Sequence, residues 1–184
     1  MRKVVGSFLI FLSFACNARN EEHYFRHYRV SISVPLYFSL KPKIFEAPSL
    51  YSDADCMELL KSEKIGLMCI FQNKNMMNDL GFFSSNEINS QEKNDVKYYV
   101  GTPMMMYPMK SWSNLEKEGY YAKIDCDTRE NQIYRATATC LSAFAFLSDN
   151  KFLFVNLILR DDTKRRQVIT KKEMLQILNG FLFN

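Results

Sequence analysis

Residues 132–159 read QIYRATATCLSAFAFLSDNKFLFVNLIL, and this stretch decides the fold. It holds two long apolar segments, 132–147 and 152–159, which are separated by a polar turn. Every second residue of the first segment from position 134 to position 146 is apolar or small, and this alternation favours a strand over a helix. These residues are Tyr134, Ala136, Ala138, Cys140, Ser142, Phe144 and Phe146. The stretch therefore predicts two long neighbouring strands of an antiparallel sheet.

Shorter patterns predict further strands on both sides of this pair. Residues 29–34 alternate serine with β-branched residues, which indicates a strand with one dry face. Residues 65–71 form a near-continuous apolar run, typical of a buried strand, and residues 120–125 alternate again. The polar segment 72–94 is expected as a long loop.

Helices are expected at three places. Ser52 precedes acidic residues like a helix cap, so residues 52–64 are predicted to be helical, and residues 111–118 make a second short helix. At the C-terminus, Thr170 and Glu173 have capping-box spacing, and Gly180 can adopt the left-handed terminating conformation. The resulting prediction is an α+β fold, a mostly antiparallel sheet with flanking helices that include a C-terminal helix.

Length and composition favour one domain and limit the possible chemistry. The chain has 184 residues, of which 47% are hydrophobic, so it can bury a core. Six glycines and five prolines argue against long linkers and glycine-rich phosphate loops. Two histidines leave little material for histidine-based catalysis or for a multi-histidine metal centre.

The N-terminus predicts export. Arg2 and Lys3 precede the uncharged segment 4–15, whose helical length of about 18 Å is too short for a bilayer core of about 30 Å. Leu12-Ser13-Phe14-Ala15-Cys16 resembles the bacterial lipobox, although Ser13 and Phe14 depart from its usual residues. The resemblance implies acylation of Cys16 in a bacterial envelope lipoprotein. Soluble secretion after cleavage near Ala15 or Ala18, and an uncleaved anchor, remain alternatives.

These expectations divide the chain into a signal peptide, residues 1–15, a tether, residues 16–28, and one α+β domain, residues 29–184. Loss of Arg2 and Lys3 with the signal lowers the formal net charge from +4 to +2. A nearly neutral domain gives no electrostatic basis for binding nucleic acid. The expected location is the cell envelope, in the periplasm or on the outer surface, with the membrane reached through the lipid.

Four cysteines remain besides Cys16, and outside the cytoplasm they suggest two disulfides. Short loops favour the pairs Cys56 with Cys69 and Cys126 with Cys140. A tight turn after Cys126 places residue 133 opposite it, so the second pair then needs a bulge or another partner. Free buried thiols are the alternative.

A methionine-rich segment is the most unusual feature of the composition. Met104, Met105, Met106, Tyr107, Met109 and Trp112 fall within nine residues, and we expect them to contact a protein partner. The alternative is a periplasmic Cu(I) site in the segment 104–112, since thioethers are soft ligands. His23 and His27 are spaced like neighbours on a helix but lack a third fixed ligand. No metal site and no cofactor are therefore predicted.

No motif predicts catalysis. The sequence holds no convincing G-x-S-x-G, S-x-x-K or Cys/His arrangement, and both histidines fall in the expected tether. The protein is therefore predicted not to be an enzyme, with an unrecognised active site as the alternative. The basic segment 164–172 is expected to be a solvated loop that leads into the terminal helix, with contact to anionic lipid as its alternative.

The ends of the domain resemble the PsbP/DcrB-like superfamily. The opening sequence VSISVP at 30–35 and the terminal sequence EMLQILNGFLF at 173–183 carry this resemblance, together with the order of the last strands and helix. The resemblance implies an exported or envelope protein that binds partners. We therefore expect a lipid-anchored, non-enzymatic binding protein, one version being an immunity or inhibitor protein directed against a secreted toxin.

Overall fold

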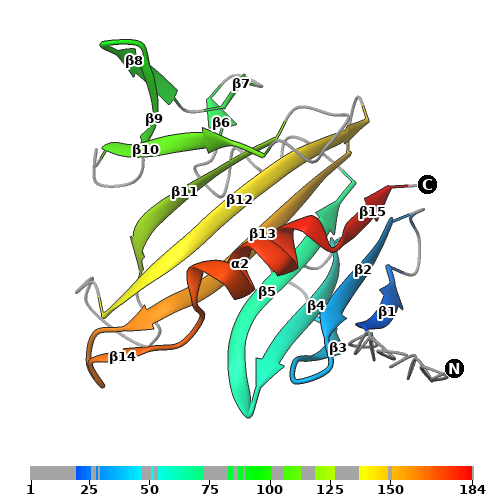
Figure 1. Cartoon of the computed structure of the whole chain (residues 1–184). Helices are drawn as coiled ribbons and strands as arrows, with labels where there is room; N and C mark the ends of the chain where they lie inside the picture. Colours follow the sequence, from blue (N-terminus) through cyan, green and yellow to red (C-terminus); the bar gives the residue numbers. More distant parts are fainter. Residues whose placement is uncertain are drawn as a thin grey trace, which may run out of the picture.

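The computed structural model describes residues 20–25, 28, 30–46, 51, 54–72, 83–84, 87–88, 90–100, 106–112, 119–126, 137–148 and 151–183. Strands dominate this part of the chain, as Figure 1 shows. The elements are β1 (Asn20–Tyr24), β2 (Val30–Pro35), β3 (Ser39–Lys43), β4 (Ala54–Lys61), β5 (Glu63–Phe71), β6 (Phe83–Ser84), β7 (Glu87–Ile88), β8 (Ser90–Lys93), β9 (Val96–Val100), β10 (Met106–Ser111), β11 (Gly119–Cys126), β12 (Ala138–Ser148), β13 (Lys151–Asp161), β14 (Arg166–Gln167), α2 (Lys171–Asn179) and β15 (Phe181–Phe183).

Two antiparallel sheets and α2 form the body of the protein. The large sheet has the order β3-β4-β5-β13-β12-β11-β10-β9-β8, with β14 added to β13. The small sheet has the order β1-β2-β15, and α2 leads directly into β15. Figure 1 shows α2 and the small sheet on the same side of the large sheet. A separate ribbon pairs β6 with β7.

The predicted α+β class with flanking helices is wrong, because the described residues are mostly β and α2 is their one helix. Residues 54–61, expected inside a helix, form β4, which pairs with both β3 and β5. Met57 and Leu59 point to one covered face of the sheet and Cys56 to the other. A strand that is covered on both faces has clustered apolar residues, and this pattern resembles a helix face. In the described part no helix has the length and apolar character needed to cross a membrane.

Other expected segments also differ. Part of the expected tether forms β1, which runs antiparallel to β2 with Asn20 opposite Pro35. The segment expected as a loop at 72–94 contains β6, β7 and β8. The second expected helix, at 111–118, lies outside the described residues after Trp112.

The strands expected from alternation and apolar runs are confirmed at β2, β5, β11, β12 and β13. The C-terminal helix and its capping box are also confirmed. The amide of Glu173 donates to the hydroxyl oxygen of Thr170 at 3.2 Å, and the amide of Thr170 donates to the Glu173 carboxylate at 2.7 Å. These reciprocal bonds satisfy donors that a helix start otherwise leaves unpaired.

The two faces of the large sheet bury different cores. The face toward the small sheet and α2 forms the main core with aliphatic side chains, including Ile32, Leu59, Val155 and Ile177. The opposite face carries an aromatic cluster, which we define as Phe71, Tyr99, Phe144, Phe152 and Phe154 with their neighbours. Phe71 and Phe152 stack with ring centroids 5.0 Å apart. Burial raises the pKa of Tyr99 to about 12.

Gly180 is required by close packing rather than by its backbone angles. Its φ of −80° and ψ of −9° are right-handed, so the expected left-handed conformation is wrong. A Cβ at this position lies only 2.1 Å from the carbonyl oxygen of Ser33 in β2. The amide of Ser33 also donates to the Gly180 carbonyl at 2.8 Å. The missing side chain therefore lets the end of α2 contact the small sheet.

Replacement of Gly180 by alanine is expected to destabilise the protein. The added methyl group meets backbone, which cannot rotate away, so we expect the free energy of unfolding to fall by about 1–3 kcal/mol. Urea unfolding followed by circular dichroism measures this change. Asn179→Ala, at the exposed neighbouring position, is the control and should shift the midpoint little; equal shifts for both variants contradict the packing argument.

Candidate functional site

Both disulfides link neighbouring strands on the aromatic face of the large sheet. Cys56 and Cys69 lie directly opposite each other in β4 and β5, with Cα atoms 4.1 Å apart. Cys126 lies opposite Ala138, and its disulfide runs diagonally to Cys140 with a Cα separation of 5.9 Å. The expected pairs are therefore confirmed. The connection from β11 to β12 is long rather than tight, which removes the need for another partner.

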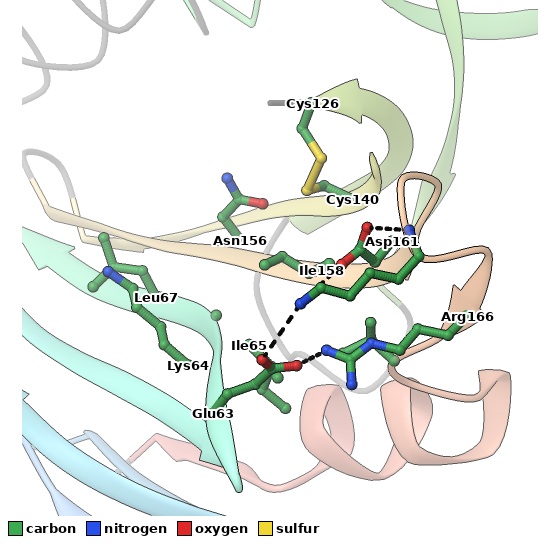
Figure 2. A pocket seen from close by; sticks show the side chains of 13 residues that line it. Glu63, Lys64, Ile65, Leu67, Cys126, Cys140, Asn156, Ile158, Asp161 and Arg166 are labelled. Carbon is green, nitrogen blue, oxygen red and sulfur yellow. Dashed lines mark hydrogen bonds and ion pairs between the residues drawn. A yellow bond between two sulfur atoms is a disulfide. The ribbon is translucent and has the colours of Figure 1, made fainter. Parts of the chain in front are cut away.

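An open groove lies beside the Cys126–Cys140 disulfide, on the face of the large sheet opposite α2. Its volume is about 470 Å³. Figure 2 shows apolar walls and charged residues gathered around it. The lining residues are Glu63, Lys64, Ile65, Gly66, Leu67, Cys126, Cys140, Asn156, Ile158, Asp161, Lys164, Arg166 and Val168. The starts of β5 and β14 and the end of β13 thus surround one space.

Two buried oxygen atoms without donors among the described residues lie at the groove and directly beside it. Asn156 lies between Leu67 of β5 and Ser142 of β12 in the sheet register. Its Oδ1 atom and the Oγ atom of Ser142 are buried, and neither has a hydrogen-bond partner among the described residues. Ser142 is 1% exposed. A buried polar group without a partner is costly, so these two atoms indicate a place where a donor from another molecule is accommodated.

Ion pairs form the rim of the groove at the tips of two hairpins. Glu63 pairs with Arg166 and lies 4.0 Å from the ammonium of Lys164. Lys164 also lies 3.7 Å from the carboxylate of Asp161. Figure 2 shows the Arg166 side chain extending toward Glu63. The rim therefore holds two cations close to the apolar walls.

Hydrogen bonds and nearby ammonium groups lower the carboxyl pKa of one acid on the rim and of one acid beside it. The hydroxyl of Thr163 and the amide of Lys164 donate to Asp161 and hold its carboxyl pKa below the usual value of 3.8. Glu58, next to the rim, accepts from Lys64 and lies near Lys43, which lowers its pKa below 4.5. Both shifts favour the charged carboxylate over the neutral acid.

The methionine-rich segment does not form one exposed surface in the described residues. Met106 is 40% exposed, whereas Met109 packs in the aromatic cluster and Trp112 in the main core. The Trp112 and Phe181 ring centroids are 5.7 Å apart, edge to face. Tyr107 is half-buried against the aromatic cluster. The expected contact residues Met104 and Met105 lie outside the described residues.

Strand β10 places the candidate thioether ligands on opposite faces of the sheet. Met106 and Met109 are an odd number of residues apart in β10, so their side chains point to opposite faces. The described residues contain no group of three or more His, Cys, Asp or Glu placed to hold a metal ion. His23 lies in β1 opposite Ile32, remote in the register from the groove, and His27 and Cys16 lie outside the described residues.

The basic segment supplies part of the groove, which the sequence did not reveal. Lys164, Arg165 and Arg166 are exposed, as expected, but Arg166 begins β14 and pairs with Glu63. Asn156 and Ser142 were also missed as site residues. The available signal was their polarity inside long apolar strands, where unpaired polar side chains are rare.

The two disulfides are expected to differ in their reactivity toward a reductant. Cys126 is half-buried at the groove, whereas Cys56 and Cys69 are 2% and 0% exposed. Access limits thiol–disulfide exchange, so mild reduction of the folded protein should open the Cys126–Cys140 bond several-fold faster. Alkylation followed by peptide mass spectrometry gives the order. Earlier labelling of Cys56 and Cys69 contradicts this assignment.

A pair of buried serines tests whether the hydroxyl of Ser142, beside the groove, is unsatisfied. Ser142→Ala removes a hydroxyl without a partner and should raise the free energy of unfolding by about 1 kcal/mol. Ser31→Ala is the matched control, because Ser31 is equally buried but donates to Glu22 at 2.9 Å, and its loss should lower stability. Urea unfolding of both variants measures the two signs. Destabilisation by Ser142→Ala shows that the hydroxyl is satisfied.

Neither known protein-family models nor curated protein sequences match this chain. The resemblance of its two ends to the PsbP/DcrB-like superfamily therefore stays a prediction. Function has to be argued from the groove, the disulfides and the N-terminal sequence.

Proposed function

We propose that this chain is an exported, non-enzymatic binding protein of the cell envelope, anchored by a lipid on Cys16, which recognises a protein partner through the groove beside Cys126–Cys140. The single observation that carries the binding site is the buried Oδ1 atom of Asn156, a residue that lines the open groove, which has no donor among the described residues; the Oγ atom of Ser142, opposite Asn156 in the register, is also unpaired. A partner that inserts a donor there gains a hydrogen bond that the protein alone does not make.

The disulfides support the proposed compartment. Stable disulfides persist in oxidising environments outside the cytoplasm, and this chain has two of them. The basic start, the apolar segment and the lipobox-like residues that end at Cys16 agree with export. Acylation of Cys16 then holds the domain at a membrane surface.

The shape and charge of the groove favour a segment of a protein as its ligand. Leu67 and Ile158 give apolar walls, and the rim carries the cations Lys64, Lys164 and Arg166. An open groove of this kind suits an apolar side chain that is flanked by an acidic residue and followed by a backbone or side-chain donor. One concrete version is an immunity or inhibitor protein that covers the active surface of a secreted toxin.

A paired substitution tests this function. The full chain, tagged after Asn184 and purified from membranes of its host, captures partners from an envelope extract for quantitative mass spectrometry. Leu67→Glu places a charge in the groove wall and should lower recovery of the specific partner at least tenfold. Leu175→Glu makes the same change on the exposed side of α2 and is the control, so its recovery should stay unchanged.

Two results contradict the proposal. In the first, recovery of the partner falls equally with both variants, or does not fall with either variant. Binding then does not use the groove. The other is an intact mass from the host that shows Cys16 without acylation, which removes the lipid anchor. Unfolding curves of both variants show that each remains folded.

A further inference from the structure

The described chain enters the fold beside an exposed hydrophobic turn. Asn20, the first residue of β1, lies opposite Pro35, the last residue of β2. The next two residues, Leu36 and Tyr37, form the turn toward β3 and are 63% and 54% exposed. Figure 1 shows β1 starting at the end of the small sheet where β2 passes into β3. The N-terminal connection and this turn therefore share one end of the molecule.

The sequence between Cys16 and β1 is short. Four peptide steps separate Cys16 from Asn20. At no more than about 3.6 Å per residue, they span at most about 14 Å. The headgroup layer on each side of a bilayer is about 5–8 Å thick. A lipid on Cys16 therefore holds the start of β1, and the turn beside it, within reach of the headgroups.

The chemistry of this end suits a lipid surface. Leucine and tyrosine at a turn tip match the membrane interface, because tyrosine has an apolar ring and a polar end. The ammonium of Lys61, at the β4–β5 hairpin tip, lies 5.8 Å from the Tyr37 ring centroid and 2.7 Å from the Glu173 carboxylate. These contacts join the turn to the start of α2 in one continuous surface.

Exposed cations border this surface. Glu63, two residues after Lys61, pairs with Arg166 and approaches Lys164, so the β13–β14 turn reaches the same hairpin tip. Lys171 and Lys172 begin α2, which Glu173 joins to Lys61. No acidic residue occurs in the segment 163–172. Anionic headgroups attract clusters of this kind within a Debye length.

We propose that the β2–β3 turn, through Leu36 and Tyr37, seats the domain on the surface of the bilayer that holds the Cys16 lipid. The inference rests on the proposed lipid anchor and deepens it, because it assigns the face of the domain that meets the membrane. Lys171 and Lys172, at the start of α2, contact anionic headgroups. The protein then stands on the membrane in a fixed orientation rather than moving freely on a tether.

Tryptophan substitution with brominated lipids tests the seating. The full chain, purified in its host-processed form, is reconstituted into vesicles of phosphatidylcholine and phosphatidylglycerol with or without bromine on the acyl chains. Leu36→Trp places the probe at the turn. Ile44→Trp is the matched control, since Ile44 is 80% exposed but follows the far end of β3. Trp112 is buried, and the unsubstituted chain gives its background.

The expected result is a blue-shifted emission for Leu36→Trp and a loss of at least a third of its intensity in brominated vesicles, with no loss for Ile44→Trp. Equal quenching of both probes, or none at Leu36→Trp in protein that floats with the vesicles, overturns the seating and leaves the anchor in place. Protein that carries no acyl group on Cys16 and does not float overturns the anchor and the seating together. Vesicles of phosphatidylcholine alone should weaken the quenching, and an undiminished signal there overturns the headgroup contact.

Discussion

The requirement to cover both faces of β12 and β13 governs the whole structure. Their side chains alternate, so Ala145 and Leu153 face one side while Phe144 and Phe154 face the other, and both sets are buried. A sheet that is apolar on two faces has to be covered twice. The small sheet and α2 cover the aliphatic face, and on the other face the rings of Tyr51 and Tyr99 pack against Phe71 and Phe144. The groove lies beyond this cluster, where Asn156 and Ile158 continue the same face of β13.

Local sequence patterns correctly predicted the elements that alternation or cap spacing alone defines. The long strands, the terminal helix and its capping box follow from alternation and from the Thr170–Glu173 spacing, which are local properties. Residues 54–61 were misread because their acidic start resembles a helix cap, whereas pairing with β3 and β5 and the bond from Cys56 to Cys69 favour the strand. The polar sequence of β1 gives no local strand pattern, since its order comes from pairing with β2. Tertiary contacts override weak propensities in these segments.

The site could be predicted only in part, for a similar reason. Short loops indicated both disulfides, but the groove depends on which residues share a face across three strands. Leu67, Asn156 and Ser142 are far apart in the sequence and become neighbours only through the register. In the methionine-rich segment, neighbours in the sequence are instead separated in the structure. Side chains alternate between the two faces along β10, so Met109 is buried while Met106 stays exposed. Composition identifies unusual residues, whereas strand register decides which of them are accessible.

The rim and the floor of the groove have different energetic roles. Exposed ion pairs such as those of Glu63 with Arg166 and Lys164 contribute about 0–1 kcal/mol each, because water screens them and ordering the long side chains costs entropy. An acidic residue of a partner therefore exchanges with Glu63 at little cost, and the rim mainly steers the approach. The buried oxygens of Asn156 and Ser142 make no hydrogen bond within the described chain, so a donor placed near them adds a hydrogen bond that the chain itself does not make. In the proposed complex, selectivity thus comes from the floor of the groove, and the rim sets how quickly a partner arrives.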